Sequence, residues 1–134
     1  MSHNDPTTVF KIDKPFENER KLTQSVIQVI GLLGMYDAEL ARILGLQCSD
    51  IGELTSGQRC ITLNSEAWLQ AKLFIETYHL LYDYFDGDSV AMYHWMHADN
   101  KYLNGTPHFL IVDDGRLQNI HDYLHRALLN KTGV

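Results

Sequence analysis

The sequence lacks the features that would place the chain outside the cytoplasm. It contains two cysteines, Cys48 and Cys60, which are too few for a disulfide framework. Its N-terminus has no basic stretch followed by an apolar one, so no signal peptide is visible. No apolar run approaches the roughly 18 residues that a membrane helix needs. We therefore expect reduced thiols, a cytoplasmic protein and no membrane partner.

Positive charge is also scarce. Eleven lysines and arginines stand against 17 aspartates and glutamates, which gives a net charge of −6 when the histidines are neutral. Affinity for duplex DNA comes largely from the neutralisation of phosphates by cationic side chains. The composition therefore excludes a small basic nucleoid protein, and any DNA-binding surface would have to be a local patch.

Proline is rare and unevenly placed. Two of the three prolines, Pro6 and Pro15, fall in the first 18 residues and argue against a helix there. We interpret residues 1–18 as an arm that is either disordered or docked by its few apolar residues. From Glu19 onward, apolar residues recur at steps of three and four, and no alternating strand pattern appears. The sequence predicts an all-α fold of about seven helices, the longest from about residue 65 to residue 85.

Residues 37–57, DAELARILGLQCSDIGELTSG, have the spacing of a helix-turn-helix. Ala41 is small where two short helices would cross closely, and Gly45 suits a turn that needs positive φ. Ile51 would fix the second helix to the first, so that the second helix could present its first side chains to a DNA groove. The segment resembles the helix-turn-helix of the Xre group of repressors. The candidate DNA contacts are Gln47, Ser49 and Asp50 for base edges, and Arg42, Thr55 and Arg59 for phosphates.

Charge leaves a second interpretation of this segment open, in which its helices only pack. Residues 37–60 contain four carboxylates and two arginines, a net charge of −2. Asp50 and Glu53 lie on the expected recognition helix, where they would repel phosphates. A carboxylate can still accept a hydrogen bond from cytosine N4, so these residues do not exclude base contact.

A second pattern occupies residues 91–107, AMYHWMHADNKYLNGTP, and continues into an amphipathic segment. Its order is a small residue, Trp, a polar loop with Asn, Leu, Gly-Thr-Pro, an apolar turn, Gly and a helix. This order resembles the toxin-binding domain of Xre/MbcA/ParS-type antitoxins, with Met96 where a leucine usually follows the tryptophan. The matching positions are Ala91, Trp95, Asn100, Leu103, Gly105, Pro107, Leu110, Gly115 and Leu124.

The resemblance extends over about residues 20–130 and implies both an organisation and a function. It implies an Xre-like helix-turn-helix at residues 19–63, followed at 64–134 by a connecting helix and a toxin-binding domain. Such antitoxins block a toxin enzyme encoded beside them, often a RES-type NAD-consuming enzyme or an ADP-ribosyltransferase-like one. They usually form homodimers, and the complex often binds its own operator DNA.

The polar loop between Trp95 and Gly105 is the natural place for partner contacts, because both of its ends are anchored. Trp95, Leu103 and Pro107 themselves are expected to be scaffold. Two alternatives remain: a free-standing repressor whose C-terminal module only dimerises it, and a ligand-gated helical regulator. The candidate toxin contacts are Asp99, Asn100, Lys101, Asn104, Arg116, Asn119, Tyr123 and His125.

The sequence offers little for catalysis or metal binding. His121 and His125 are spaced so that both could face one metal on a helix, but there is no His-Glu-x-x-His motif and no close cysteine pair. A core or interface role for these histidines is the better interpretation. No phosphate-binding glycine loop and no nucleophile motif is present. We expect no catalytic residue, no metal site, no cofactor and no enzymatic activity.

Overall fold

The computed structural model describes residues 18–131, which form seven α-helices and no named strand. The all-α prediction of about seven helices is therefore confirmed. No helix in this part of the chain is both long enough and apolar enough to cross a bilayer. Apart from Asn18, the predicted N-terminal arm lies outside the described residues. The helices are α1 (Glu19–Leu32), α2 (Asp37–Leu44), α3 (Cys48–Ser56), α4 (Glu66–Tyr84), α5 (Ser89–His97), α6 (Pro107–Val112) and α7 (Leu117–Lys131).

Helices α1, α4 and α5 begin at short polar side chains that accept hydrogen bonds from free N–H groups of the first turn. The Asn18 side chain accepts a hydrogen bond from the Lys21 N–H at 3.0 Å, and the Ser65 hydroxyl accepts from the Trp68 N–H at 3.1 Å. Helix α2 begins at Asp37, and its cap position belongs to Tyr36.

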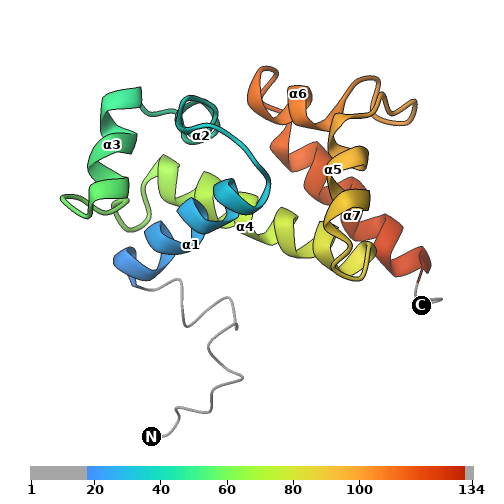
Figure 1. Ribbon diagram of the computed structural model, residues 1–134, viewed down its shortest axis with the longest axis horizontal. Helices are drawn as coiled ribbons and strands as arrows, with labels where there is room; N and C mark the ends of the chain where they lie inside the picture. The colour runs from blue at the N-terminus through green and yellow to red at the C-terminus, as the bar shows by residue number, and fades with distance from the viewer. Residues whose placement is uncertain (1–17, 132–134) are drawn as a thin grey trace, which may run out of the picture.

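Helix α4 is the central element of the fold. It contacts α1 and α2 on one side and α5 and α7 on the other (Figure 1). Its buried residues include Trp68, Phe74 and Leu81, all at most 3% exposed. Burial of one such side chain contributes about 1.5–3 kcal/mol. A single hydrophobic cluster runs from Leu22 in α1 to Leu124 in α7, so the two halves of the chain share one core.

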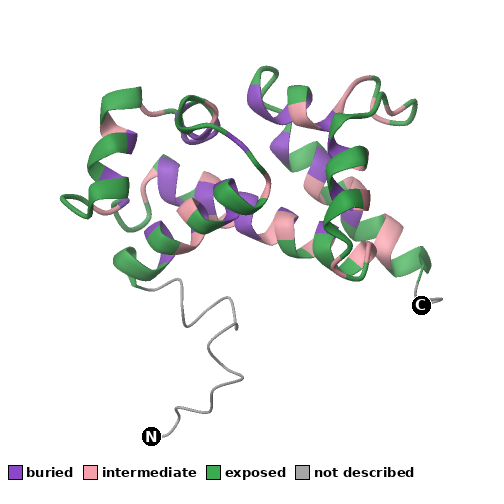
Figure 2. Cartoon of the chain, in the orientation of Figure 1, coloured by how far each residue is buried: buried purple, intermediate pink, exposed green. Residues whose placement is uncertain are grey.

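A buried threonine fixes the connection between α3 and α4. The Thr23 side chain lies in the core, where its hydroxyl donates to the Glu19 carbonyl at 2.7 Å and accepts from the Ile61 N–H at 2.9 Å. Because an unpaired buried N–H would be costly, this bond holds the connecting segment against α1. The outward faces of α3 and of the loop between α5 and α6 stay exposed (Figure 2).

Candidate partner-binding pocket and helix-turn-helix surface

Helices α2 and α3 contact each other in the segment for which the sequence predicts a helix-turn-helix. Gly45 ends α2 in the left-handed region at φ 71°. Ala41 is 3% exposed and Ile51 is fully buried, so both helices contribute to the core. What this pair of helices could contact depends on the side chains that it exposes.

The base-reading candidates lie at the start of α3. Gln47 and Ser49 are exposed there, but Asp50 is engaged within the protein. One Asp50 oxygen accepts from the Gln47 backbone N–H at 3.0 Å, and the other accepts from Arg59 at 2.8 Å. These two hydrogen bonds hold the pKa of Asp50 below its usual range. Asp50 is thus a fixed negative charge that caps α3.

Both arginines of the motif are paired with carboxylates. Arg59 lies 2.8 Å from Asp50 and 3.0 Å from Glu53, and Arg42 pairs with Asp113 at the end of α6. These side chains are substantially exposed, so each pair contributes only about 0–1 kcal/mol and can open. When a pair opens, its carboxylate remains beside the arginine. Net attraction for DNA phosphates is therefore weak on this surface.

Thr55 lies near the C-terminal end of α3, and Arg59 follows that helix and reaches back to Asp50 at 2.8 Å. Both line a hollow of about 300 Å³ together with Arg20 of α1. The Thr55 hydroxyl donates to the Gly52 carbonyl of its own helix at 3.1 Å. Of the six DNA candidates, Asp50, Arg42 and Arg59 are thus engaged in ion pairs within the protein, while Gln47 and Ser49 are exposed.

The loop between α5 and α6 is held in shape by Asn100. The Asn100 side-chain oxygen accepts from the backbone N–H groups of Tyr102 at 3.0 Å and Leu103 at 3.3 Å. Asn100 and Gly105 also exchange two backbone hydrogen bonds, at 2.9 and 3.3 Å. Asn104 closes the turn with a left-handed backbone at φ 62°. Asn100 and Asn104 thus build the loop that carries their neighbours.

Three aromatic rings stack beside this loop. Trp95 and Tyr123 lie 6.2 Å apart between ring centroids and 23° from parallel. Tyr102 and Tyr123 lie 6.5 Å apart and 25° from parallel. Tyr102 is 85% exposed although its backbone is held by Asn100. The rings border a surface hollow of about 260 Å³, which we call the aromatic pocket; it is lined by Trp95, Ala98, Asp99, Asn100, Lys101, Tyr102 and Tyr123.

The aromatic pocket gathers half of the residues predicted to contact a toxin. Asp99, Asn100, Lys101 and Tyr123 line it. The remaining candidates, Asn104, Arg116, Asn119 and His125, are exposed but are not among its lining residues.

Sequence reasoning gave one aromatic residue of this pocket only a structural role and missed another. Trp95 was expected to be scaffold; it is half-buried, packs against the core cluster and also lines the pocket. Tyr102 was absent from the candidates. The available signal was a large aromatic residue inside an otherwise polar loop.

A histidine cluster joins α2 to the C-terminal half. Glu39 accepts from the Tyr36 backbone N–H at 2.9 Å, and its second oxygen lies 2.7 Å from His108 Nε2 of α6. The His97 ring stacks on His108 with 4.7 Å between centroids. Partial burial would raise the pKa of Glu39, but the bonds from Tyr36 and His108 and the nearby imidazoles lower it below its usual value. This cluster fixes the helix-turn-helix against α6.

A larger hollow of about 400 Å³ lies between the end of α1, α4 and α5. Tyr78, Tyr82, Met92, Tyr93 and His97 contribute to its lining, which is mainly apolar. Its position between the two halves is the feature of the fold that best suits the ligand-gated alternative.

The two histidines considered for metal binding have other neighbours. His121 Nε2 lies 3.5 Å from Glu76 Oε1, and His121 Nδ1 lies 3.1 Å from Asp122 Oδ1. The His121 ring also stacks on His125. Within residues 18–131, no group of three or more His, Cys, Asp or Glu side chains is arranged to hold a metal ion. These contacts place His121 at the packing surface between α7 and α4.

Comparison with known proteins adds no relative. No protein-family model matches the chain, and no curated protein matches it significantly.

Proposed function

We propose that this chain is the antitoxin of a toxin–antitoxin pair, a non-enzymatic protein that binds and blocks a cognate toxin. The observation that carries the proposal is the aromatic pocket. It is an exposed surface on a fixed loop, and it lies in the segment that resembles the toxin-binding domain of Xre/MbcA/ParS-type antitoxins. Exposed aromatic residues are typical of protein interfaces, which supports a protein as the partner.

The toxin class follows from the resemblance alone. We propose a RES-type NAD-consuming enzyme or an ADP-ribosyltransferase-like enzyme, encoded beside the antitoxin and blocked in the cytoplasm. A homodimer of the chain and an operator-bound complex are further parts of this proposal. The paired arginines suggest that DNA binding is weak unless the toxin adds positive charge to the complex.

A free-standing repressor is the second candidate function. The packing of α2 on α3 and the left-handed Gly45 support it, because these features match a DNA-binding scaffold. The acidic recognition helix argues against it. If the purified chain binds no operator DNA even at low salt, where phosphate contacts are strongest, the repressor proposal fails.

Co-expression tests the antitoxin proposal. The product of the neighbouring gene is expressed alone and together with this chain, and the chain is then purified by affinity. We expect the neighbour to stop growth alone, to be harmless in the pair, and to co-purify with the chain. A harmless neighbour that does not co-purify would overturn the proposal.

A further inference from the structure

We propose that the aromatic pocket binds a cationic side chain, an arginine or a lysine, that a protein partner presents. The inference deepens the proposed function, because it relies on that function only for the identity of the partner. It is argued from the rings, the charges and the rigidity of the pocket.

The rings provide the first argument. The face of an aromatic ring carries partial negative charge and attracts a cation placed above it. Tyr102 leaves most of its surface open to solvent, while Tyr123 and Trp95 continue the stack behind it. A planar guanidinium can lie parallel to such a ring and still donate hydrogen bonds sideways.

The charges around the pocket provide the second argument. Residues 64–131 contain nine aspartates and glutamates against five lysines and arginines. Asp99 lines the pocket, is exposed, and forms no ion pair with any residue in the described part of the chain. A cation on the Tyr102 ring would therefore find a free carboxylate beside it.

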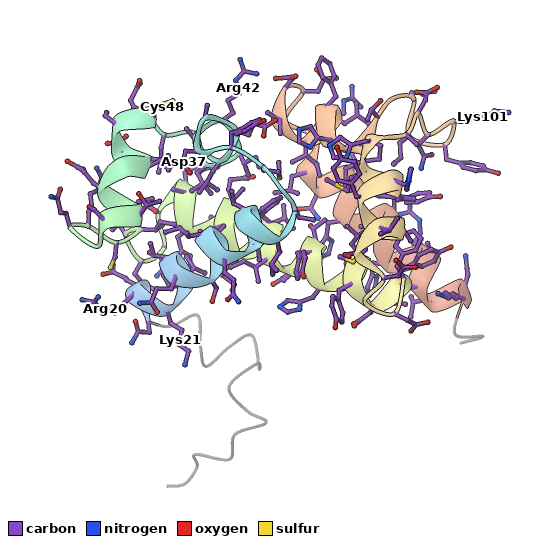
Figure 3. All side chains as sticks on the ribbon, in the orientation of Figure 1. Arg20, Lys21, Asp37, Arg42, Cys48 and Lys101 are labelled. Carbon is purple, nitrogen blue, oxygen red and sulfur yellow. The ribbon has the colours of Figure 1, made fainter. Side chains whose placement is uncertain are left out.

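Lys101 is the one cation of the pocket, and its direction matters. Its side chain extends outward from the loop, away from the helices (Figure 3). A ligand cation between Tyr102 and Asp99 would be weakly repelled by Lys101 rather than blocked by it. Removal of this exposed lysine should therefore strengthen the binding of a cation.

Rigidity provides the third argument. The Asn100 bonds and the Asn100–Gly105 pairing hold the loop before any partner arrives. Little loop ordering is then lost on binding, so a modest contact with one side chain can contribute measurable affinity.

The test is a selection that needs no toxin. Random peptides displayed on phage are selected on the wild-type chain, and binders to Tyr102→Ala are subtracted. We expect arginine or lysine at one position of the enriched peptides. Enrichment of acidic, proline-rich or purely aliphatic peptides, or no enrichment, would overturn the proposal.

A synthetic copy of an enriched peptide then defines the contact. We expect Tyr102→Ala and Asp99→Asn each to weaken its binding about tenfold, Tyr102→Phe to retain it, and Lys101→Gln to strengthen it. Tyr36→Ala is the matched control, because Tyr36 is 75% exposed but belongs to the cap of α2. Weaker binding by Lys101→Gln would assign an anionic ligand to the pocket and contradict the proposal.

The two proposals can fail separately. Basic peptides without a toxic, co-purifying neighbour would leave the cation pocket standing and remove the antitoxin function. A neutralised neighbour without basic peptides would do the reverse. Unchanged thermal unfolding of each variant shows that lost binding is not lost folding.

Discussion

At the residue scale, the two tryptophans lie in different surroundings. Trp68 of α4 is 3% exposed and belongs to the core cluster. Trp95 of α5 is half-buried, packs against the same cluster and stacks on Tyr123. The first therefore contributes mainly to stability, and the second contributes to the surface that a partner would meet.

Alanine substitutions should separate these roles. We expect Trp68→Ala to lower the free energy of unfolding by about 3–5 kcal/mol, because a large cavity would remain. Trp95→Ala should cost less, about 1–2 kcal/mol, since Trp95 is only partly buried. Urea unfolding followed by circular dichroism measures both. A Trp95→Ala loss as large as that of Trp68→Ala would show that Trp95 is core.

The sequence could not rank these residues. Composition and spacing identify a tryptophan as a large apolar group, but both positions fit an apolar helical face. The surroundings of Trp95 depend on α7, which lies more than 20 residues later in the chain. This helix places the Tyr123 ring beside Trp95. Tyr102 was missed for the same reason, because its place in the ring stack depends on contact with Tyr123 of α7.

At the element scale, α3 is the helix predicted to contact DNA, and its carboxylates form ion pairs with a neighbouring arginine. Asp50 and Glu53 hold Arg59, and Asp50 also caps the helix through the Gln47 N–H. The element is thereby stabilised by the same carboxylates that oppose DNA.

Release of Arg59 should create DNA affinity. In the Asp50→Asn, Glu53→Gln double variant, the asparagine oxygen can still accept from Gln47, while two negative charges are removed. We expect binding of a short mixed-sequence duplex at low salt to strengthen about tenfold, because Arg59 can then contact a phosphate.

Fluorescence anisotropy measures this binding, and a further Arg59→Ala change is the control that should cancel the gain. Unchanged affinity of the double variant would show that charge on α3 does not limit DNA binding.

Elements were the most predictable level of this molecule. Helical periodicity predicts a helical pattern from Glu19 and a longest helix from about residue 65 to residue 85, close to the observed start of α1 and bounds of α4. The shape of the loop between α5 and α6 was not predictable in the same way. It depends on the hydrogen bonds of a single side chain, Asn100, which leave no periodic trace in the sequence.

At the scale of the whole molecule, the first three helices and the C-terminal half share one core and are further joined by polar contacts. Glu39 with His108 and Arg42 with Asp113 connect α2 to α6 and its end. Both carboxylate oxygens of Glu39 have hydrogen-bond partners, the Tyr36 backbone N–H and the His108 ring.

This junction should make stability fall in acid. The folded-state pKa of Glu39 is below its ordinary value of 4.5, so the ionised carboxylate stabilises the fold above pH 4.5. The contribution is lost as the pH falls through the lowered pKa. We expect Glu39→Gln to reduce the free energy of unfolding by about 1 kcal/mol at pH 7 and by much less at the acid end.

Urea unfolding between neutral pH and pH 3 measures this difference, with Asp114→Asn as a control for an exposed carboxylate of the other half. A Glu39→Gln deficit that stays constant down to pH 3 would contradict the role of its charge.

The arrangement of the halves was only partly foreseeable. The sequence predicts one long helix at about residues 65–85 with shorter helices on both sides of it, and α4 occupies that place in the chain. It gives no signal that His108 would meet Glu39, because contacts between elements so far apart depend on how the helices cross. For this reason, the residue with which a given charged side chain pairs is the feature of this chain that is hardest to predict from the sequence.

The central claim is that the C-terminal aromatic pocket, and not the helix-turn-helix, is the surface that matters most for the partner. The most direct measurement is the affinity of the purified neighbouring gene product for two double variants by isothermal titration calorimetry. The account predicts that Tyr102→Ala with Asp99→Asn loses at least about tenfold in affinity. Gln47→Ala with Ser49→Ala should bind like the wild type. Loss of partner binding in the second variant, with the first unaffected, would contradict the account.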